Sequence, residues 1–143
     1  MQSEDTTLEW LFSGCKNLKE IYGLDDALET TGVVNSIQHM FFNCKKLKKV
    51  NIMANIKIKS NIIDDFCANC YELESIQMPN FVIDDTNENN KTITGHLAFY
   101  SCSNLKDINM ANMVKQEFKF YGQGFYWNCE NLEENKRPFK VEE

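Results

Sequence analysis

The chain has 143 residues, of which 43% are hydrophobic, and this is sufficient for a single domain, residues 1–143, with its own core. Its net charge of −6 excludes a general nucleic-acid binder, because such proteins need a basic face. No apolar run reaches the roughly 18 residues that a membrane-spanning helix requires, so we expect no membrane span.

The first predicted element is an N-terminal cap, residues 1–12. Residues 1–5 are expected to fray, and Asp5 or Thr6 is suited to cap a short helix that runs through Phe12. The apolar side of this helix would cover the open end of the structure that follows, as terminal caps of repeat proteins do. The polar and acidic start does not have the character of a signal peptide.

A repeat centred on cysteine follows and extends over residues 11–132. Its cysteines, spaced 26 to 32 residues apart, are Cys15, Cys44, Cys70, Cys102 and Cys129. Three positions after them stand the leucines Leu18, Leu47, Leu73, Leu105 and Leu132. The residues directly before them are small or turn-prone: Gly14, Asn43, Asn69, Ser101 and Asn128. Three positions before them, four copies carry an aromatic residue and the third carries Cys67. A period of this length indicates repeating units that stack on one another.

The most regular copy is residues 34–52. Its apolar residues recur about every three positions and then alternate at Val50 and Ile52. The three-residue rhythm predicts short helical turns, and the alternation predicts a strand with one buried face. No copy can bury its apolar side alone, so we predict an α/β repeat fold, a solenoid of about five coils. Its strands would form one short parallel β-sheet, about 4.8 Å apart.

The pattern V-x-x-[MI]-x-x-M-F-x-x-C-x-x-L-x-x-[LV]-x-[LI] in residues 34–52 resembles the repeats of BspA-like leucine-rich repeat surface proteins. The closer likeness is to the subgroup abundant in mycoplasma-type surface lipoproteins. The cysteine-centred half matches in every copy, whereas Gly95 and Gly122 depart from the pattern at the position of Ile37. The resemblance implies a leucine-rich repeat fold and a surface binding or adhesion role, and it supplies no catalytic residues.

Three later segments differ from the regular repeat. The composition of the polar insert at residues 84–95 predicts an exposed loop. The aromatic run at residues 118–127 is a second candidate binding region, although core packing is favoured because Phe125 and Tyr126 occupy repeat positions. The charged C-terminal tail, residues 133–143, is expected either to close the stack or to extend into solvent.

We predict that the five repeat cysteines form a structural ladder of free, buried thiols. Equivalent positions on adjacent coils point their Cα–Cβ bonds the same way, which is poor geometry for a disulfide, and free cysteine packs as a small apolar group. Cys44→Ser should therefore destabilise the fold by roughly 1–3 kcal/mol, since it places a hydroxyl in an apolar stack. The pair Cys67 and Cys70 also has the spacing of half a zinc or redox site. The structural interpretation is favoured, because Cys67 stands at an aromatic repeat position and no second such pair exists.

The sequence predicts no catalytic residue, metal ligand or cofactor. His39 and His96 occupy dissimilar places outside any nucleophile motif, and His39 is expected to point outward. The adjacent acidic pairs lack the spacing of a calcium loop and are expected to be solvated: Asp25 with Asp26, Asp64 with Asp65, and Asp84 with Asp85. The lysine run at residues 45–49 is expected to be the solvated side of one coil.

The candidate binding face consists of the outward-facing residues of the predicted strands. These are Glu20, Tyr22, Lys49, Asn51, Ser75, Gln77, Asp107 and Asn109. Their polar, mixed-charge character suits a protein or glycan partner, and it is equally compatible with a face that is merely soluble. We expect a non-enzymatic binding or adhesion module at the cell surface or secreted, with no cofactor. The alternative is an intracellular, cytoplasmic repeat scaffold for protein–protein interaction, which free thiols favour.

Overall fold

The computed structural model describes residues 6–84 and 91–142. Residues 1–5, which were expected to fray, lie outside the described residues. So does the middle of the insert, residues 85–90. Within the described part, the strands form three small parallel sheets of three strands each. The sequence predicted one sheet, and the presence of two further sheets corrects that expectation.

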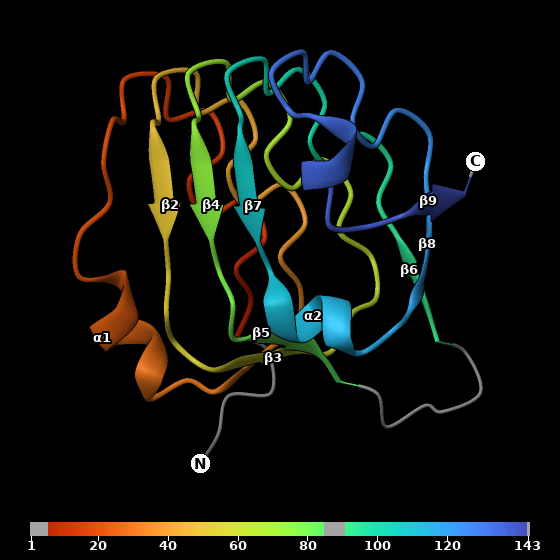
Figure 1. Cartoon of the computed structure of the whole chain (residues 1–143). Coiled ribbons are helices and arrows are strands. Elements are labelled where there is room, and N and C mark those ends of the chain that lie inside the picture. Colours follow the sequence, from red (N-terminus) through yellow and green to blue (C-terminus); the bar gives the residue numbers. More distant parts are fainter. Residues whose placement is uncertain (1–5, 85–90, 143) are drawn as a thin grey trace.

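The first sheet is the predicted one. It contains β2 (Lys49–Asn51), β4 (Ser75–Gln77) and β7 (Asp107–Asn109), which lie side by side in this order in Figure 1. The strands pair in repeat register, with Val50 beside Ile76 and Ile76 beside Ile108. The alternation around Val50 thus becomes a strand whose central side chain enters the core.

The two other sheets lie on the remaining legs of the stacked chain. One contains β1 (Val33–Val34), β3 (Ile56–Ile58) and β5 (Phe81–Ile83), and the other contains β6 (Thr92–Thr94), β8 (Lys119–Tyr121) and β9 (Val141–Glu142). Both are parallel throughout. Because β6 includes the buried Ile93, the insert at residues 84–95 ends in a strand rather than in an exposed loop.

The segment before each repeat cysteine is a run of tight turns. We call these runs the turn segments: residues 10–15, 39–44, 65–70, 97–102 and 124–129. Each closes hydrogen bonds over three residues, as from the Cys44 amide to the Phe41 carbonyl at 3.1 Å. This explains the three-residue rhythm, but two residues in each segment have positive φ, for example His39 at 57° and Asn43 at 61°. A left-handed residue interrupts a helix, so the predicted helical turns are consecutive turns without a continuous helix.

The left-handed residues account for the turn-prone column before the cysteines. The φ angles there are 75° at Gly14, 61° at Asn43, 64° at Asn69, 59° at Ser101 and 61° at Asn128. Glycine and asparagine adopt this conformation at least cost, which is why they dominate the column.

Backbone hydrogen bonds join each turn segment to the next. The Phe41 amide donates to the Phe66 carbonyl at 2.9 Å, and the Cys67 amide donates to the Ala98 carbonyl at 2.9 Å. The same bond links Phe12 to Met40 and Phe99 to Phe125. The turn segments are therefore stacked in repeat register.

The core runs along the inside of this stack. The leucine column is fully buried at Leu47, Leu73 and Leu105, each 0% exposed. The rings of Phe41 and Phe66 meet edge to face with centroids 5.6 Å apart, and Phe66 meets Phe99 at 6.0 Å. Such contacts stabilise aromatic pairs beyond the area that they bury.

Three short helices lie in the described residues, one before β1, one between β7 and β8, and one between β8 and β9. They are α1 (Leu24–Glu29), α2 (Ala111–Lys115) and the 3-10 helix η1 (Glu134–Lys136). None of the helices in the described ranges is long and apolar enough to cross a membrane.

The first copy differs from the prediction. The expected helix through Phe12 is wrong, because the described residues from Thr6 to Phe12 form extended chain and turns. Glu20 and Tyr22 do not lie in a strand, and this leg joins its neighbour through the Lys48 amide and Lys19 carbonyl, 3.2 Å apart.

The C-terminal tail packs against the last turn segment. Phe139 is 3% exposed, and its ring stacks on that of Phe120 with centroids 4.2 Å apart. The strand β9 extends the sheet of β6 and β8. Of the two expectations for the tail, closing the stack is the one that the described residues follow.

Candidate functional site

The outer face of the sheet β2-β4-β7 carries two aligned rows of polar side chains, which we call the polar face. One row contains Lys49, Ser75 and Asp107, and the other contains Asn51, Gln77 and Asn109. Beneath them, the interleaved Val50 and Ile76 are buried. Strand alternation therefore places these polar groups on the side away from the core.

The second row of the polar face is a ladder of side-chain amides. The Asn109 Nδ2 atom donates a hydrogen bond to the Gln77 Oε1 atom at 3.0 Å. Amides offer both donors and acceptors, and the first row adds a cation at Lys49 and an anion at Asp107. Such a surface can form many hydrogen bonds to peptide groups or sugar hydroxyls.

Glu20 and Tyr22, which the sequence assigned to the same face, lie before β2 in chain that is not a strand. Both are exposed, and the Tyr22 hydroxyl donates a hydrogen bond to the Glu20 carboxylate. This bond and the nearby negative charge raise the pKa of Tyr22. The two residues therefore bond to each other rather than continue the rows of the sheet.

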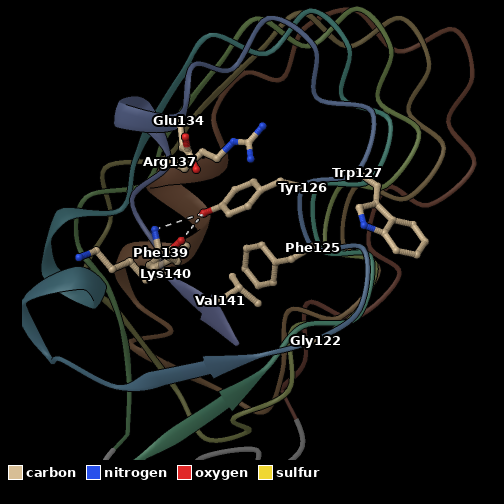
Figure 2. Close-up of a pocket in the computed structure, with 9 residues that line it drawn as sticks. All are labelled: Gly122, Phe125, Tyr126, Trp127, Glu134, Arg137, Phe139, Lys140 and Val141. Atoms are coloured by element: carbon tan, nitrogen blue, oxygen red, sulfur yellow. Dashed lines mark hydrogen bonds between the residues drawn. The ribbon is translucent and has the colours of Figure 1, made fainter. Parts of the chain in front are cut away.

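A pocket of about 510 Å³ lies at the C-terminal end, between the last turn segment and the tail. Figure 2 shows the residues that line it. They are Gly122, Phe125, Tyr126, Trp127, Glu134, Arg137, Phe139, Lys140 and Val141. We call it the tail pocket.

Tyr126 anchors the tail in this pocket. Its hydroxyl donates to the Phe139 carbonyl and accepts from the Phe139 amide, both at 3.2 Å. Burial raises the pKa of Tyr126, and the bond to Phe139 and the charge of Arg137 oppose that rise. The phenol is thus a neutral structural group that fixes the pocket wall.

The aromatic run at residues 118–127 divides between core and pocket. Phe125 is 2% exposed and packs in the core, as the repeat pattern favoured, whereas Trp127 is 53% exposed. Sequence reasoning missed Arg137 and Phe139, because the tail was considered only as a closing or trailing segment. The signal that could have revealed Phe139 is a single aromatic residue within a charged tail.

The repeat thiols are arranged in a regular series of contacts with the backbone. The last four each donate to the carbonyl three positions before the preceding repeat cysteine, as from Cys44 Sγ to Phe12 O and from Cys70 Sγ to Phe41 O, both at 3.0 Å. Cys102 and Cys129 repeat the contact at 3.0 and 2.9 Å. Their surroundings are therefore not purely apolar, which corrects the premise of the Cys44→Ser expectation.

Burial makes these thiols poor nucleophiles. Removal from water raises the pKa of Cys44 to about 12, and burial raises that of Cys129 to about 11. All six cysteines are free. Cys15 differs from the rest because it is exposed, so the expected buried ladder does not include it.

Cys67 lies inside the core at 0% exposure, with its sulfur 3.6 Å from that of Cys102. Burial raises its pKa to about 11. In the described residues, no group of three or more His, Cys, Asp or Glu is placed to hold a metal ion.

His39 is not the outward-pointing surface residue that the sequence indicated. Its ring stacks on that of Trp10 with centroids 3.9 Å apart, and its Nε2 atom lies 3.0 Å from Asp65 Oδ2. Asp64 accepts a hydrogen bond from the His96 amide at 2.9 Å. Both members of the acidic pair at 64 and 65 therefore have partners in the chain instead of lying free in solvent.

Comparison with known families accounts for the repeat. The family described as BspA type Leucine rich repeat region (6 copies) matches residues 5–92 and 34–143. The chain therefore belongs to the BspA-type leucine-rich repeat family. Repeats of this kind generally mediate protein binding or adhesion, and proteins that carry them are often associated with the cell surface. Searches of curated proteins and of solved structures found no match.

Proposed function

We propose that this chain is a non-enzymatic binding or adhesion module of a surface leucine-rich repeat protein, of the mycoplasma-type lipoprotein subgroup. Its repeats act as a solenoid of five coils that presents the polar face to a protein or glycan partner. The observation that carries the proposal is the pair of polar rows held in register across β2, β4 and β7. Aligned groups on a rigid sheet lose little entropy on binding.

The chemistry of the conspicuous side chains supports a role without catalysis. The buried thiols have raised pKa values, so little thiolate exists near neutral pH to act as a nucleophile. His39, the histidine with an acidic partner, is engaged by Trp10 on one ring face. The polar face offers hydrogen bonds and charges, which suit recognition.

A second candidate is an intracellular scaffold for protein–protein interaction. The observation that favours it is Cys15, an exposed free thiol. Exposed thiols persist in reducing compartments and become oxidised outside them. The polar face would serve either function, so the two candidates differ in location and not in binding surface.

Protease treatment of intact source cells separates the two candidates. A surface module releases peptides of this chain while a cytoplasmic marker protein stays intact. Protection of the chain until the cells are lysed would overturn the surface proposal and leave the scaffold. A permeabilised sample serves as the control that the chain can be cleaved.

A further inference from the structure

The tail pocket is locally cationic in an acidic protein. Two of its lining residues, Arg137 and Lys140, carry positive charge, and Glu134 carries the one negative charge among the lining residues. The whole chain has a net charge of −6. The positive charge of the pocket attracts anions, whereas the acidic surface of the rest of the chain repels them. An anion that binds this chain is therefore expected to bind at the pocket.

The Arg137 side chain packs over the aromatic ring of Tyr126 and forms no ion pair with a carboxylate in the described residues. Its guanidinium carbon lies 5.2 Å from the centroid of the Tyr126 ring, and Figure 2 shows the group extended above that ring. In the described residues, its Nε atom is buried without a hydrogen-bond partner, and His39 with Asp65 is the only ion pair. Within the described ranges, Arg137 therefore forms no direct ion pair with Glu134 or with another carboxylate.

The rest of the pocket wall is aromatic. Phe125 and Phe139 form its inner part, Tyr126 is fixed by two hydrogen bonds, and Trp127 is exposed at its edge. Aromatic walls with a few placed polar groups are typical of small-ligand sites, and about 510 Å³ lies within their usual range. A flat apolar group can pack on the exposed ring of Trp127 or on the half-buried ring of Tyr126, while a carboxylate pairs with the guanidinium of Arg137.

We propose that the tail pocket binds an aromatic carboxylate, through the guanidinium of Arg137 and the aromatic wall. The same chemistry occurs in a free aromatic acid and at the C-terminal aromatic residue of a peptide. This site lies apart from the polar face, since it is built from the last turn segment and the tail. It therefore stands or fails independently of the proposed binding function.

Fluorescence titration of the whole chain tests the site. The chain has two tryptophans, so Trp10→Phe leaves Trp127 as the single reporter, at the pocket edge. The probes are N-acetylphenylalanine, 3-phenylpropionate and N-acetylphenylalaninamide. The third keeps the ring and lacks the carboxylate. Saturable binding of both acids indicates a site for aromatic acids in general, and binding of N-acetylphenylalanine alone indicates a peptide terminus.

The acids should bind at least about tenfold more tightly than the amide, because a charged hydrogen bond is lost with the carboxylate. Arg137→Gln should weaken the acids by a similar factor, while the matched control Lys136→Gln should leave binding unchanged. Arg137→Lys keeps the charge but not the planar set of donors, so its affinity for the acids should lie between that of the wild type and that of Arg137→Gln. Urea unfolding of each variant shows whether it is folded.

Equal affinity for acid and amide would overturn the proposal, and so would the absence of saturation with either acid. An effect of Lys136→Gln as large as that of Arg137→Gln would also overturn it, since net charge alone would then explain binding.

Discussion

Replacement of Cys70 distinguishes a thiol that only fills space from one that also donates a hydrogen bond. The sulfur is 0% exposed and lies 3.0 Å from the Phe41 carbonyl, which also accepts the Cys44 amide. Cys70→Ala removes the sulfur, and the lost burial of a group of this size costs about 1 kcal/mol of stability. The cavity adds about 0.5 kcal/mol, and the lost weak hydrogen bond adds about 0.5 kcal/mol.

Cys70→Ala should therefore lower the free energy of unfolding by about 2 kcal/mol in total. Cys70→Ser restores a donor to the same carbonyl and part of the lost volume, so its cost should be about 1 kcal/mol. The same order should hold at Cys44, where the carbonyl of Phe12 is the acceptor. Purely apolar surroundings would instead make serine the worse replacement.

Urea unfolding followed by circular dichroism measures both variants against the wild type, provided that the slopes with urea agree. Cys15→Ala, at an exposed position, is the control and should stay within about 0.5 kcal/mol of the wild type. If Cys70→Ser proves less stable than Cys70→Ala by 1 kcal/mol or more, the sulfur–carbonyl contact is not a hydrogen bond and the reasoning is wrong.

Three further predictions concern the thiols and the glycines. A thiol reagent at pH 8 should modify Cys15 rapidly in the native protein and the other five only after unfolding, since those five are buried; more than one fast thiol would contradict the packing. The pKa of Cys44 is raised from 9.0 to about 12, so the unfolded chain ionises first, and stability should be complete below pH 9 and fall as the pH rises towards 12. The urea midpoint of Cys44→Ala should fall less steeply with pH than that of the wild type over this range. Equal dependence on pH in the two proteins would argue against the raised pKa of Cys44. Gly122→Ala should cost more than about 3 kcal/mol, because its Cβ would lie 2.5 Å from the Gly95 carbonyl oxygen at a φ of +155°. Gly14→Ala, with nothing within 4 Å at a φ of +75°, should cost only about 1 kcal/mol in thermal unfolding; equal losses would refute the steric argument.

The features that the sequence predicted are those tied to the cysteine repeat by a constant offset. Leu47 and Leu73 are buried at equivalent places, and the strands β2 and β4 pair with the register of the repeat. A constant offset places equivalent residues side by side once the turns stack. The positions of the polar residues Lys49 and Ser75 on one face follow from that register alone.

Of the two unexpected sheets, β1-β3-β5 has no constant offset from the cysteines, whereas β6 and β8 each begin ten residues before a repeat cysteine. Ile56 pairs with Phe81, although they stand at different distances after Cys44 and Cys70. The alternation of buried and exposed residues in Ile56–Ile58 is a strand signal, but it is too short to be separated from a connecting loop. Loops of variable length between the repeats therefore hide this second pairing from a repeat alignment.

The tail pocket depends on contacts that no local pattern encodes. Tyr126 and Phe139 meet because the tail folds back over the last turn segment. Their separation in sequence carries no periodic signal, and the sequence left open whether the tail closes the stack or extends into solvent. Similarly, Glu20 and Tyr22 share the strand spacing of later copies, but their leg meets the next one through the bond from the Lys48 amide to the Lys19 carbonyl and forms no strand.

Site-specific photo-crosslinking in the source cells tests the central claim most directly. A photoreactive residue at Ser75 lies on β4, the central strand of the polar face, and one at Lys57 lies on β3, the central strand of another sheet. The account predicts a discrete covalent adduct from position 75 and none from position 57. Adducts from position 57 alone, or the same adducts from both positions, would show that β2, β4 and β7 do not form the binding face.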